Sequence, residues 1–434
     1  MVTWRNWAGE QRCAPHAIER PRSEAELIEV VGRAADQGLG VRAVGSGHSF
    51  TDAACTDGVM VSLDRMGTVL EADPASGLVR VQGGIVLREL ALTLASRGLA
   101  LENQGDIDSQ TISGAVSTAT HGTGTGFVNL SGQLASLRLV TAAGEAVEVS
   151  EDDDPRAFRA ARVAVGSLGV ISELTLRCVP AFRIHRIDEP RPLAEVLAAL
   201  EELADAHDHF EFFAFPYTDT ALTLTSTRTE EPARPRDGRG AWIEEELVYN
   251  GVFGALTRLG RAFPTLVPSL NRLVTRMSSG SEQLDSSHRI YAHDRRVRFT
   301  EMEYGIPRQA AAIAIERVMD LVERRRLPVG FPIEVRFVAP DDALLSPSYE
   351  RPTCYIAVHM TAGVEFESFF RAVEEIMREY GGRPHWGKRH YRTAADLAPA
   401  YPEWDAFQAV RSRLDQTGVF TNEYAERVLG PVSG

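Results

Sequence analysis

The sequence predicts an α+β protein with two domains, and three observations predict it. The chain has 434 residues, which is long enough for two hydrophobic cores. Segments with strand periodicity and segments with helix periodicity follow one another irregularly, without the alternation that builds a parallel α/β sheet. The composition also changes after Pro180.

The first part of the chain is expected to start with an amphipathic helix, followed by short strands. Residues 24–38 carry apolar side chains at helical spacing, which predicts a helix with one buried face. Three strands and a further helix are expected next, at 41–44, 59–63, 77–82 and 86–97. Residues 134–149 predict a hairpin that turns near Gly144, and residues 166–171 lead into another strand. The acidic residues 151–154 are interpreted as a solvated turn before a short helix, and not as a metal site.

The second part continues as a mixture of helices and strands. Leucine and valine side chains at helical spacing predict a helix over 192–206, and residues 210–215 alternate as in a strand. Residues 228–240 are polar and contain prolines and glycines, which is typical of an exposed loop. An apolar stripe predicts a helix over 364–380, and we interpret this stripe as core packing and not as a cofactor site.

Composition and charge limit the function classes. The hydrophobic fraction of 44% and the charged fraction of 24% are those of a soluble globular protein. The net charge of −14 argues against nucleic acid or an anionic membrane surface as a partner, since both attract cations. Neither a secretory signal nor a run long enough to span a bilayer is visible. The four cysteines lack metal-ligand spacing and are expected to be free thiols in a reducing cytoplasm: Cys13, Cys55, Cys178 and Cys354.

Residues 41–50 (Val-Arg-Ala-Val-Gly-Ser-Gly-His-Ser-Phe) predict a strand that runs into a tight glycine loop. Gly45 and Gly47 permit positive φ angles and a close approach of the backbone to a ligand. Successive free N–H groups in such a loop form a nest for an anion, typically a phosphate. The spacing matches neither the mononucleotide phosphate loop nor G-x-G-x-x-G, which disfavours a nicotinamide-dependent dehydrogenase.

Residues 105–126 form a second glycine-rich segment, in which small and hydroxyl side chains dominate. Such residues allow backbone N–H groups and short hydroxyls to approach a large polar ligand. A flexible linker is the alternative interpretation. Core-type side chains interrupt the segment and disfavour a linker: Ile107, Ile112, Val116 and Phe127.

Four short motifs carry a resemblance to a known family. They are Gly-Ser-Gly-His-Ser at 45–49, Ser-Gly-Ala-x5-His-Gly-Thr-Gly at 113–124, Ile-Glu-Val-Arg at 333–336 and Arg-Pro-His-Trp-Gly-Lys at 383–388. The chain resembles the vanillyl-alcohol-oxidase superfamily of flavoproteins, and within it the aldonolactone oxidoreductase branch. The resemblance covers essentially the whole chain.

The resemblance implies a two-domain α+β flavoprotein. A PCMH-type FAD-binding domain would occupy residues 1–181, and an α+β substrate or cap domain would occupy residues 182–388. Residues 389–434 would return to the FAD domain. The implied cofactor is FAD, and no metal is expected.

The resemblance also implies an activity. Stretches such as 101–105 and 299–304 are more similar to bacterial gulonolactone dehydrogenases than to alditol oxidases. The implied reaction is oxidation of a sugar-1,4-lactone of the L-gulono-1,4-lactone type at C2, by hydride transfer to flavin N5, with an ascorbate-type product. The electron acceptor could be a cytochrome, a dye or oxygen. An alditol oxidase acting on xylitol or sorbitol is the alternative, and a flavin- or sugar-binding module without turnover is disfavoured.

The flavin is expected to lie against the two glycine segments, residues 169–171 and His385. His48 is the residue expected to bond covalently to the flavin, although an isolated loop histidine is more often structural. The residues that the resemblance assigns to cofactor binding are Val44, Gly45, Ser46, Gly47, His48, Ser49, Ser113, Gly114, Ser117, Thr118, His121, Gly122, Gly169, Val170, Ile171 and His385.

Glu334 and Arg336 are the first candidates for the catalytic site. They alternate with apolar residues over 333–337, so strand geometry places both charged side chains on one face. A surface salt bridge is the alternative interpretation. In the family the matching pair holds the substrate hydroxyl against the flavin, and Arg336 would polarise and orient substrate oxygen atoms.

Four further residues complete the predicted site. His359 and Thr361 share one face of a strand predicted over 353–361 and are candidates for the substrate pocket wall. Lys388 matches a lysine near the flavin N1–C2=O edge in relatives, where a fixed cation would favour the reduced flavin. Ala115 stands where alditol oxidases have a substrate-contacting serine, which favours a lactone over a polyol. Three residues before or within the second glycine segment could also line the pocket, and the sequence does not favour one of them over the others: Glu102, Asn103 and Asp106.

Overall fold

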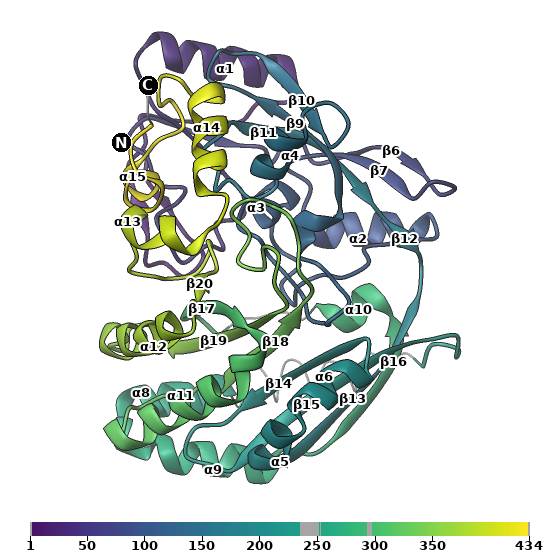
Figure 1. Ribbon diagram of the computed structural model, residues 1–434, viewed down its shortest axis with the longest axis vertical. Coiled ribbons are helices and arrows are strands. Elements are labelled where there is room, and N and C mark those ends of the chain that lie inside the picture. Colours follow the sequence, from purple (N-terminus) through teal and green to yellow (C-terminus); the bar gives the residue numbers. More distant parts are fainter. Residues whose placement is uncertain (1, 235–250, 252, 293–296, 433–434) are drawn as a thin grey trace.

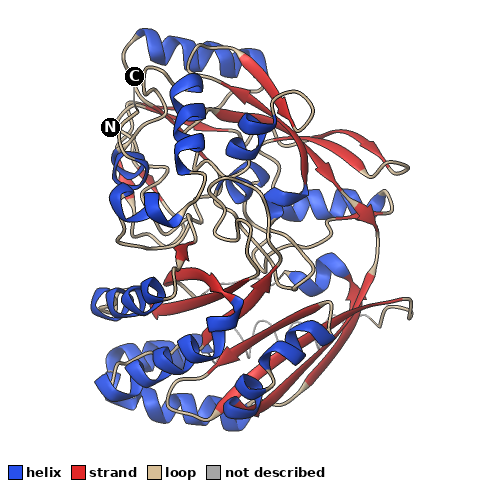
Figure 2. Ribbon diagram, viewed as in Figure 1, coloured by secondary structure: helices blue, strands red, loops and turns tan. Residues whose placement is uncertain are grey.

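A computed structural model of the chain describes residues 2–234, 251, 253–292 and 297–432. It has two lobes along its long axis, and both chain ends lie in the upper lobe of Figure 1. Each lobe combines helices with sheets, without a regular alternation of the two (Figure 2). The predicted α+β class is therefore confirmed.

The upper lobe is built from two main sheets and the helices that cover them. A small parallel sheet has the order β3-β5-β4, and a larger antiparallel sheet has the order β10-β9-β11-β7-β6. The strands of this lobe are β1 Trp4–Arg5, β2 Arg12–Cys13, β3 Ala17–Glu19, β4 Val41–Val44, β5 Val59–Ser62, β6 Val69–Asp73, β7 Leu78–Gln82, β8 Leu99–Ala100, β9 Leu134–Val140, β10 Ala146–Ser150, β11 Val170–Arg177 and β12 Val179–Pro180. Its helices are α1 Glu24–Asp36, α2 Leu87–Ser96, α3 Ile112–Ser117, α4 Pro155–Ala161, α13 Ala394–Leu397, α14 Trp404–Leu414 and α15 Glu423–Leu429.

The start and the end of the chain share the core of this lobe. Trp404 and Phe407 of α14 and Tyr424 of α15 belong to the same buried hydrophobic cluster as the strands of the larger sheet. The buried Arg42 guanidinium links early and late segments, because it donates hydrogen bonds to the carbonyl oxygens of Ala53, Val165, Gly166 and Phe420. Such hydrogen bonds stabilise a buried charge that would otherwise be costly.

The lower lobe contains one sheet of eight strands, in the order β16-β13-β15-β14-β18-β19-β17-β20. Its strands are β13 Arg183–Pro192, β14 His209–Ala214, β15 Thr220–Thr229, β16 Ser281–Ser286, β17 Phe299–Pro307, β18 Ile333–Val338, β19 Thr353–Thr361 and β20 Arg383–Pro384. Its helices are α5 Leu193–Ala198, α6 Leu200–Ala206, α8 Phe253–Ala262, α9 Val267–Met277, α10 Ser287–Tyr291, α11 Ala311–Arg325 and α12 Glu367–Glu379.

Four helices cover one face of this sheet. Apolar side chains of the strands, such as Phe212, Val335 and Ile356, form one buried cluster with α5, α6, α11 and α12. Successive side chains of a strand point to opposite faces. The residues between these apolar positions therefore lie on the other face, towards the upper lobe (Figure 1).

Most of the predicted elements are observed within about two residues of the expected bounds, including the hairpin of β9 and β10. The helix predicted over 192–206 is wrong in one respect, because Ala199, with φ −104° and ψ 16°, separates α5 from α6. The apolar stripe runs across this break, so its periodicity could not reveal it. The loop predicted over 228–240 starts as the end of β15, Arg234 forms an isolated bridge with Leu284, and residues 235–240 lie outside the described residues.

Candidate active site

The face of the lower sheet that points to the upper lobe carries a cluster of charged side chains. Adjacent strands bring them together, because Glu211 of β14 pairs with Arg336 of β18, and Glu301 of β17 pairs with His359 of β19. Glu334 lies two residues before Arg336, on the same face. The predicted grouping of Glu334, Arg336 and His359 is thus present in the structure.

Arg336 lies at the centre of this cluster and is almost fully buried, with 8% of its side chain exposed. Its Nη2 is 2.6 Å from a Glu334 oxygen, and its Nε is 2.6 Å from a Glu211 oxygen. Its Nη1 is 3.5 Å from an oxygen of Asp106, which comes from the second glycine segment. Burial alone would lower the pKa of Arg336, but attraction to these three carboxylates outweighs it and raises the pKa well above its ordinary value. The guanidinium is therefore a fixed cation.

Lys388, in the segment after β20, supplies a second, half-buried cation beside this face. Its Nζ is 2.5 Å from a Glu301 oxygen, and this oxygen is also 3.4 Å from Nε2 of His359. His359 Nε2 lies 3.8 Å from Glu334 as well, so one chain of contacts joins Lys388 to the Arg336 cluster. Burial alone would raise the pKa of Glu301. Attraction to Lys388 and His359 lowers this pKa by a larger amount, so the net shift is downward. The pKa of Lys388 is raised, because Glu301 and Glu303 outweigh its burial.

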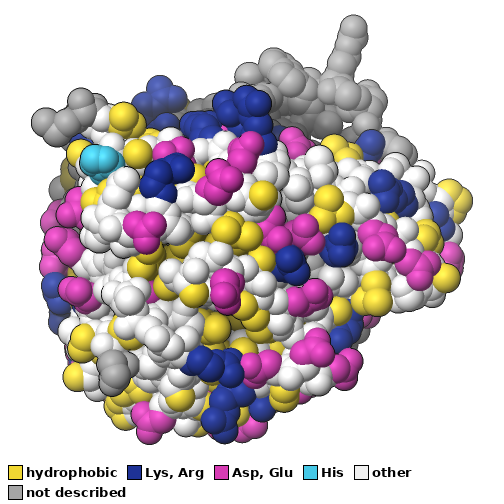
Figure 3. Space-filling view, turned by 90° about the horizontal axis from the view of Figure 1, so that it is seen from above, with side chains coloured by type: hydrophobic (Ala, Val, Ile, Leu, Met, Phe, Trp, Pro, Cys, Tyr) yellow, Lys and Arg dark blue, Asp and Glu magenta, His cyan; other side chains and the backbone are white. Residues whose placement is uncertain are grey.

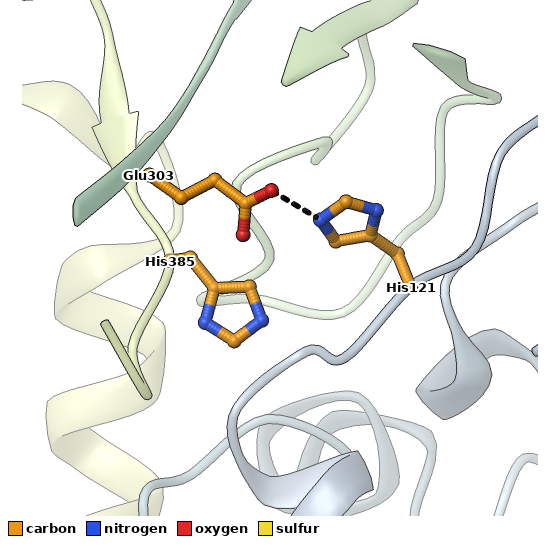
Figure 4. A group of neighbouring side chains, drawn as sticks. All are labelled: His121, Glu303 and His385. Carbon is orange, nitrogen blue, oxygen red and sulfur yellow. Dashed lines mark ion pairs between the residues drawn. The ribbon is translucent and has the colours of Figure 1, made fainter. Parts of the chain in front are cut away.

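A third buried group, His121, Glu303 and His385, lies beside Lys388, and Figure 4 shows the three side chains converging. His121 Nδ1 is 2.8 Å from the Gly122 carbonyl oxygen, which can only accept, so Nδ1 carries a proton. His121 Nε2 faces a Glu303 carboxylate oxygen at 3.4 Å. His385 differs, because its Nδ1 accepts a hydrogen bond from the Gly387 N–H at 3.0 Å. Burial lowers the pKa of His385 to about 3, so this ring is neutral.

Two fully buried histidines should make the fold sensitive to acid. Burial lowers the pKa of both His385 and His390 to about 3, whereas a histidine in the unfolded chain has a pKa of about 6.5. Below that value the unfolded state binds protons that the folded state does not, so stability falls as the pH falls towards 3. Each group is expected to lower the free energy of unfolding by about 2 kcal/mol between about pH 7.5 and about pH 5.

Urea unfolding at the two pH values checks this expectation. The variant His390→Gln, which cannot titrate, should show a smaller pH dependence than the unmodified protein. His16→Gln, at an exposed position, is the matched control and should leave the dependence unchanged. An identical pH dependence in all three proteins would contradict the assignment.

His48 lies at the exit of the first glycine loop and is held from two sides. Its ring stacks on Trp7, with a centroid distance of 5.3 Å and an interplanar angle of 22°. Its Nε2 is 2.8 Å from the Ser109 hydroxyl, which comes from the second glycine segment. Burial, and then the charge of Lys388, lower the pKa of His48 to about 4. The ring is therefore neutral at pH 7, as a nucleophilic nitrogen must be.

The two glycine segments have the shape and the polar groups that a dinucleotide cofactor such as FAD requires. None of the hydrogen bonds among the described residues is donated by the backbone N–H groups of residues 46–49. A side chain at Gly45 would approach Thr111 Oγ1 to 2.1 Å, and one at Gly122 would approach the Gln104 carbonyl oxygen to 2.4 Å. Buried polar atoms without a hydrogen-bond partner in the described structure lie in the second segment and in the two residues before it: Asn103 Oδ1, Gln104 Nε2, Thr111 Oγ1 and Thr120 Oγ1. The residues present therefore fit the flavin cofactor.

The remaining predicted residues are not all part of the charged cluster. Ala115 is fully buried in the hydrophobic core of the upper lobe. Thr361 lines a small cavity together with residues of α8 and α9, at the outer end of β19. Residues of both glycine segments are partly accessible, whereas the β11 residues are buried. The accessible or half-buried ones are Gly45, Ser46, Gly47, Ser49, Ser113, Gly114 and Ser117, and the buried ones are Val44, Thr118, Gly169, Val170 and Ile171.

Sequence reasoning missed five residues of the site. Glu301 and Glu303 carry the same alternating signal as Glu334 and Arg336, since they alternate with Thr300, Met302 and Tyr304, and this pattern could have identified them. Glu211, Trp7 and Ser109 had no such signal, because only the tertiary fold brings them to Arg336 and His48.

Comparisons with known proteins agree on one family. The family model for D-arabinono-1,4-lactone oxidase matches residues 174–428, and the model for an FAD binding domain matches residues 15–150. The chain is 58% identical to L-gulono-1,4-lactone dehydrogenase of Mycobacterium tuberculosis, over 99% of both chains. It is 34% identical to L-gulonolactone oxidase of Bos taurus (99% and 98% covered) and 31% identical to alditol oxidase of a Streptomyces species (98% of both).

Solved structures share the fold at much lower identity. A solvent-stable cholesterol oxidase superposes with a TM-score of 0.82 at 20% identity, over 99% of this chain and 97% of that one. A cholesterol oxidase from B. sterolicum gives a TM-score of 0.81 at 17% identity, over 99% and 96%. These similarities establish the two-lobe fold and nothing about the cofactor or the substrate.

Proposed function

Because the chain belongs to the D-arabinono-1,4-lactone oxidase family, we propose that it is an FAD-dependent enzyme that oxidises L-gulono-1,4-lactone, or a lactone of matching configuration, at C2. The buried Arg336 cluster, on the face of the lower sheet that points to the upper lobe, carries this proposal, because it provides a fixed cation for substrate oxygen atoms. The product would be a 2-keto lactone, which tautomerises to ascorbate.

The two lobes would have different roles. Residues 1–181 and 389–434 would hold FAD through the two glycine segments, and residues 182–388 would supply the charged face. Bound FAD provides a two-electron acceptor. A cytochrome or another oxidant would then take the electrons, and the cytoplasm is the proposed compartment.

The chain's own residues would bind and orient the lactone. Arg336 keeps N–H groups beyond those that face its three carboxylates, and these can donate to a substrate oxygen. Glu334 holds the guanidinium in place and can accept a hydrogen bond from a substrate hydroxyl. Lys388 adds positive charge near the flavin, which favours the negative charge that the flavin gains on reduction.

The substrate class can be tested directly with the purified protein. It should be yellow, and L-gulono-1,4-lactone should bleach it faster than xylitol or sorbitol under anaerobic conditions. A higher kcat/KM for the polyols would favour the alditol oxidase alternative. A yellow protein that no sugar derivative reduces would point to a binding module without turnover.

FAD is expected to be bound covalently through His48. Ser109 contacts Nε2, so Nδ1 is the ring nitrogen without a hydrogen bond in the described structure, and the neutral ring keeps a lone pair for bond formation. The flavin should stay with the denatured polypeptide and fluoresce in an acid-treated gel. The variant His48→Ala should lose this signal, and Ser109→Ala should show a smaller covalent fraction. Complete release of flavin into the acid supernatant would exclude the covalent bond but not FAD binding.

A further inference from the structure

The helices α8 and α9 carry an unusual concentration of exposed apolar side chains. Eleven large hydrophobic residues are exposed in the described part of the chain, and five of them lie within one stretch of 19 residues. Their exposed fractions are Leu259 39%, Phe263 57%, Leu266 41%, Leu273 46% and Met277 66%. Contiguous exposed apolar residues on a protein surface mark an interaction site more often than isolated ones do.

The opposite sides of these two helices pack firmly on the lower lobe. Thr257 of α8 and Val267 of α9 are buried, and the Asn271 amide donates to the carbonyl oxygens of Pro216 and Val329 at 3.1 and 3.0 Å. Leu266, Leu273 and Met277 are spaced at i, i+7 and i+11, so they share the outer side of α9. These three side chains therefore lie away from the buried contacts of α9. The helix pair of α8 and α9 is at the lower left of Figure 1.

Basic residues accompany this apolar face. Arg258, Arg261, Arg272 and Arg276 are all exposed, and none forms an ion pair with a carboxylate of the described residues. Residues 247–281 contain these four arginines and no aspartate or glutamate, in a chain with a net charge of −14. The face seen in Figure 3 differs, because acidic and basic side chains alternate across it without a large patch of one sign. The net charge of the whole chain thus conceals a local excess of positive charge.

From this arrangement we infer that the outer face of α8 and α9 docks on an anionic phospholipid membrane. Aromatic and aliphatic side chains on one face, bordered by arginines, are the pattern of helices that lie in the interface of a bilayer. The two helices have 10 and 11 residues, and no helix in the described part of the chain is long and apolar enough to cross a membrane. The contact would therefore be peripheral.

This surface lies next to the candidate active site. Thr361 follows His359 on the same face of β19, and it lines a small cavity with Leu256 of α8 and Val267 of α9. Docking would therefore hold the outer end of the site close to the membrane. The inference does not depend on which substrate the enzyme oxidises.

Vesicle sedimentation with the purified, FAD-loaded protein tests the inference. The protein should bind phosphatidylcholine vesicles that contain phosphatidylglycerol, and it should bind much less to phosphatidylcholine alone or at high salt, where charges are screened. The double variant Arg272→Gln/Arg276→Gln should bind about thirtyfold more weakly, given the contribution of each basic residue near an anionic surface. The double variant Phe263→Ser/Met277→Ser should also bind at least about tenfold more weakly.

Matched control variants show whether vesicle binding depends on this surface or on exposed apolar and charged side chains in general. Leu92→Ser/Ile313→Ser removes two equally exposed apolar side chains elsewhere, and Arg65→Gln/Arg97→Gln removes two exposed charges elsewhere. Both should bind vesicles like the unmodified protein. Equal binding by all variants, or no binding to anionic vesicles, would overturn the inference. Light scattering could also overturn the inference. If the unmodified protein is a dimer and only the variant Phe263→Ser/Met277→Ser is a monomer, this face joins two copies of the chain and does not dock on a membrane.

Discussion

Replacing Arg336 by leucine is expected to destabilise the protein and to abolish most of its activity on lactones. The substitution leaves Glu211, Glu334 and Asp106 close together without their common cation. Removing one partner of a buried ion pair costs about 3–5 kcal/mol, because the remaining charge stays desolvated. Loss of a charged hydrogen-bond donor to the substrate should lower kcat/KM for the lactone by about a hundredfold or more.

Three measurements separate these effects. Urea unfolding gives the loss of stability, and the additional change Glu334→Gln should restore part of it, because it removes one unpaired charge. Anaerobic reduction should slow far more for the lactone than for a small alcohol that cannot reach the guanidinium, and the flavin potential should stay almost unchanged. Arg317→Leu is the control, because Arg317 makes a similar bidentate pair with Glu379 at the surface, and such pairs contribute about 1 kcal/mol or less. Equal losses in the two variants would contradict the role of Arg336.

The charged face of the site is predictable where it depends on local strand geometry. The alternation over 333–337 and 353–361 is enough to place Glu334, Arg336 and His359 on strand faces from the sequence alone. Both strands exist with nearly the expected bounds, and they are neighbours in the sheet. Local periodicity is sufficient here because it depends only on residues close in sequence.

The partners of these residues are not predictable in the same way. Glu211 reaches Arg336 only because β14 and β18 pair in one register, although 125 positions separate the two residues. His48 and Ser109 meet because the two glycine segments fold against each other, over a separation of 61 positions. Periodicity contains no information about such pairings, and a sheet register shifted by one residue would have placed Glu211 on the apolar face.

Lys388 is predicted to act on the flavin as a fixed cation, and the structure adds a partner that the sequence did not indicate. Its ammonium group is paired with Glu301, so the two residues together would set the charge near a bound flavin. Replacing Lys388 by methionine removes the cation and leaves Glu301 buried beside His359. Attraction to Lys388 is one of the causes that lower the pKa of Glu301, so this carboxyl should bind a proton more readily in the variant.

The variant Lys388→Met is therefore expected to lower the flavin reduction potential and to slow reduction by every substrate alike. Losing one preorganised donor typically costs about 3–4 kcal/mol, which is a hundred- to a thousandfold in rate. Glu301→Gln should act in the opposite direction on the potential, because it releases the ammonium group from its carboxylate. Redox titration of both single variants and of the double variant distinguishes the two charges, and reduction by two different substrates shows whether the effect depends on the substrate. An unchanged potential in Lys388→Met, or the same direction of shift in both single variants, would show that Lys388 does not act on the flavin.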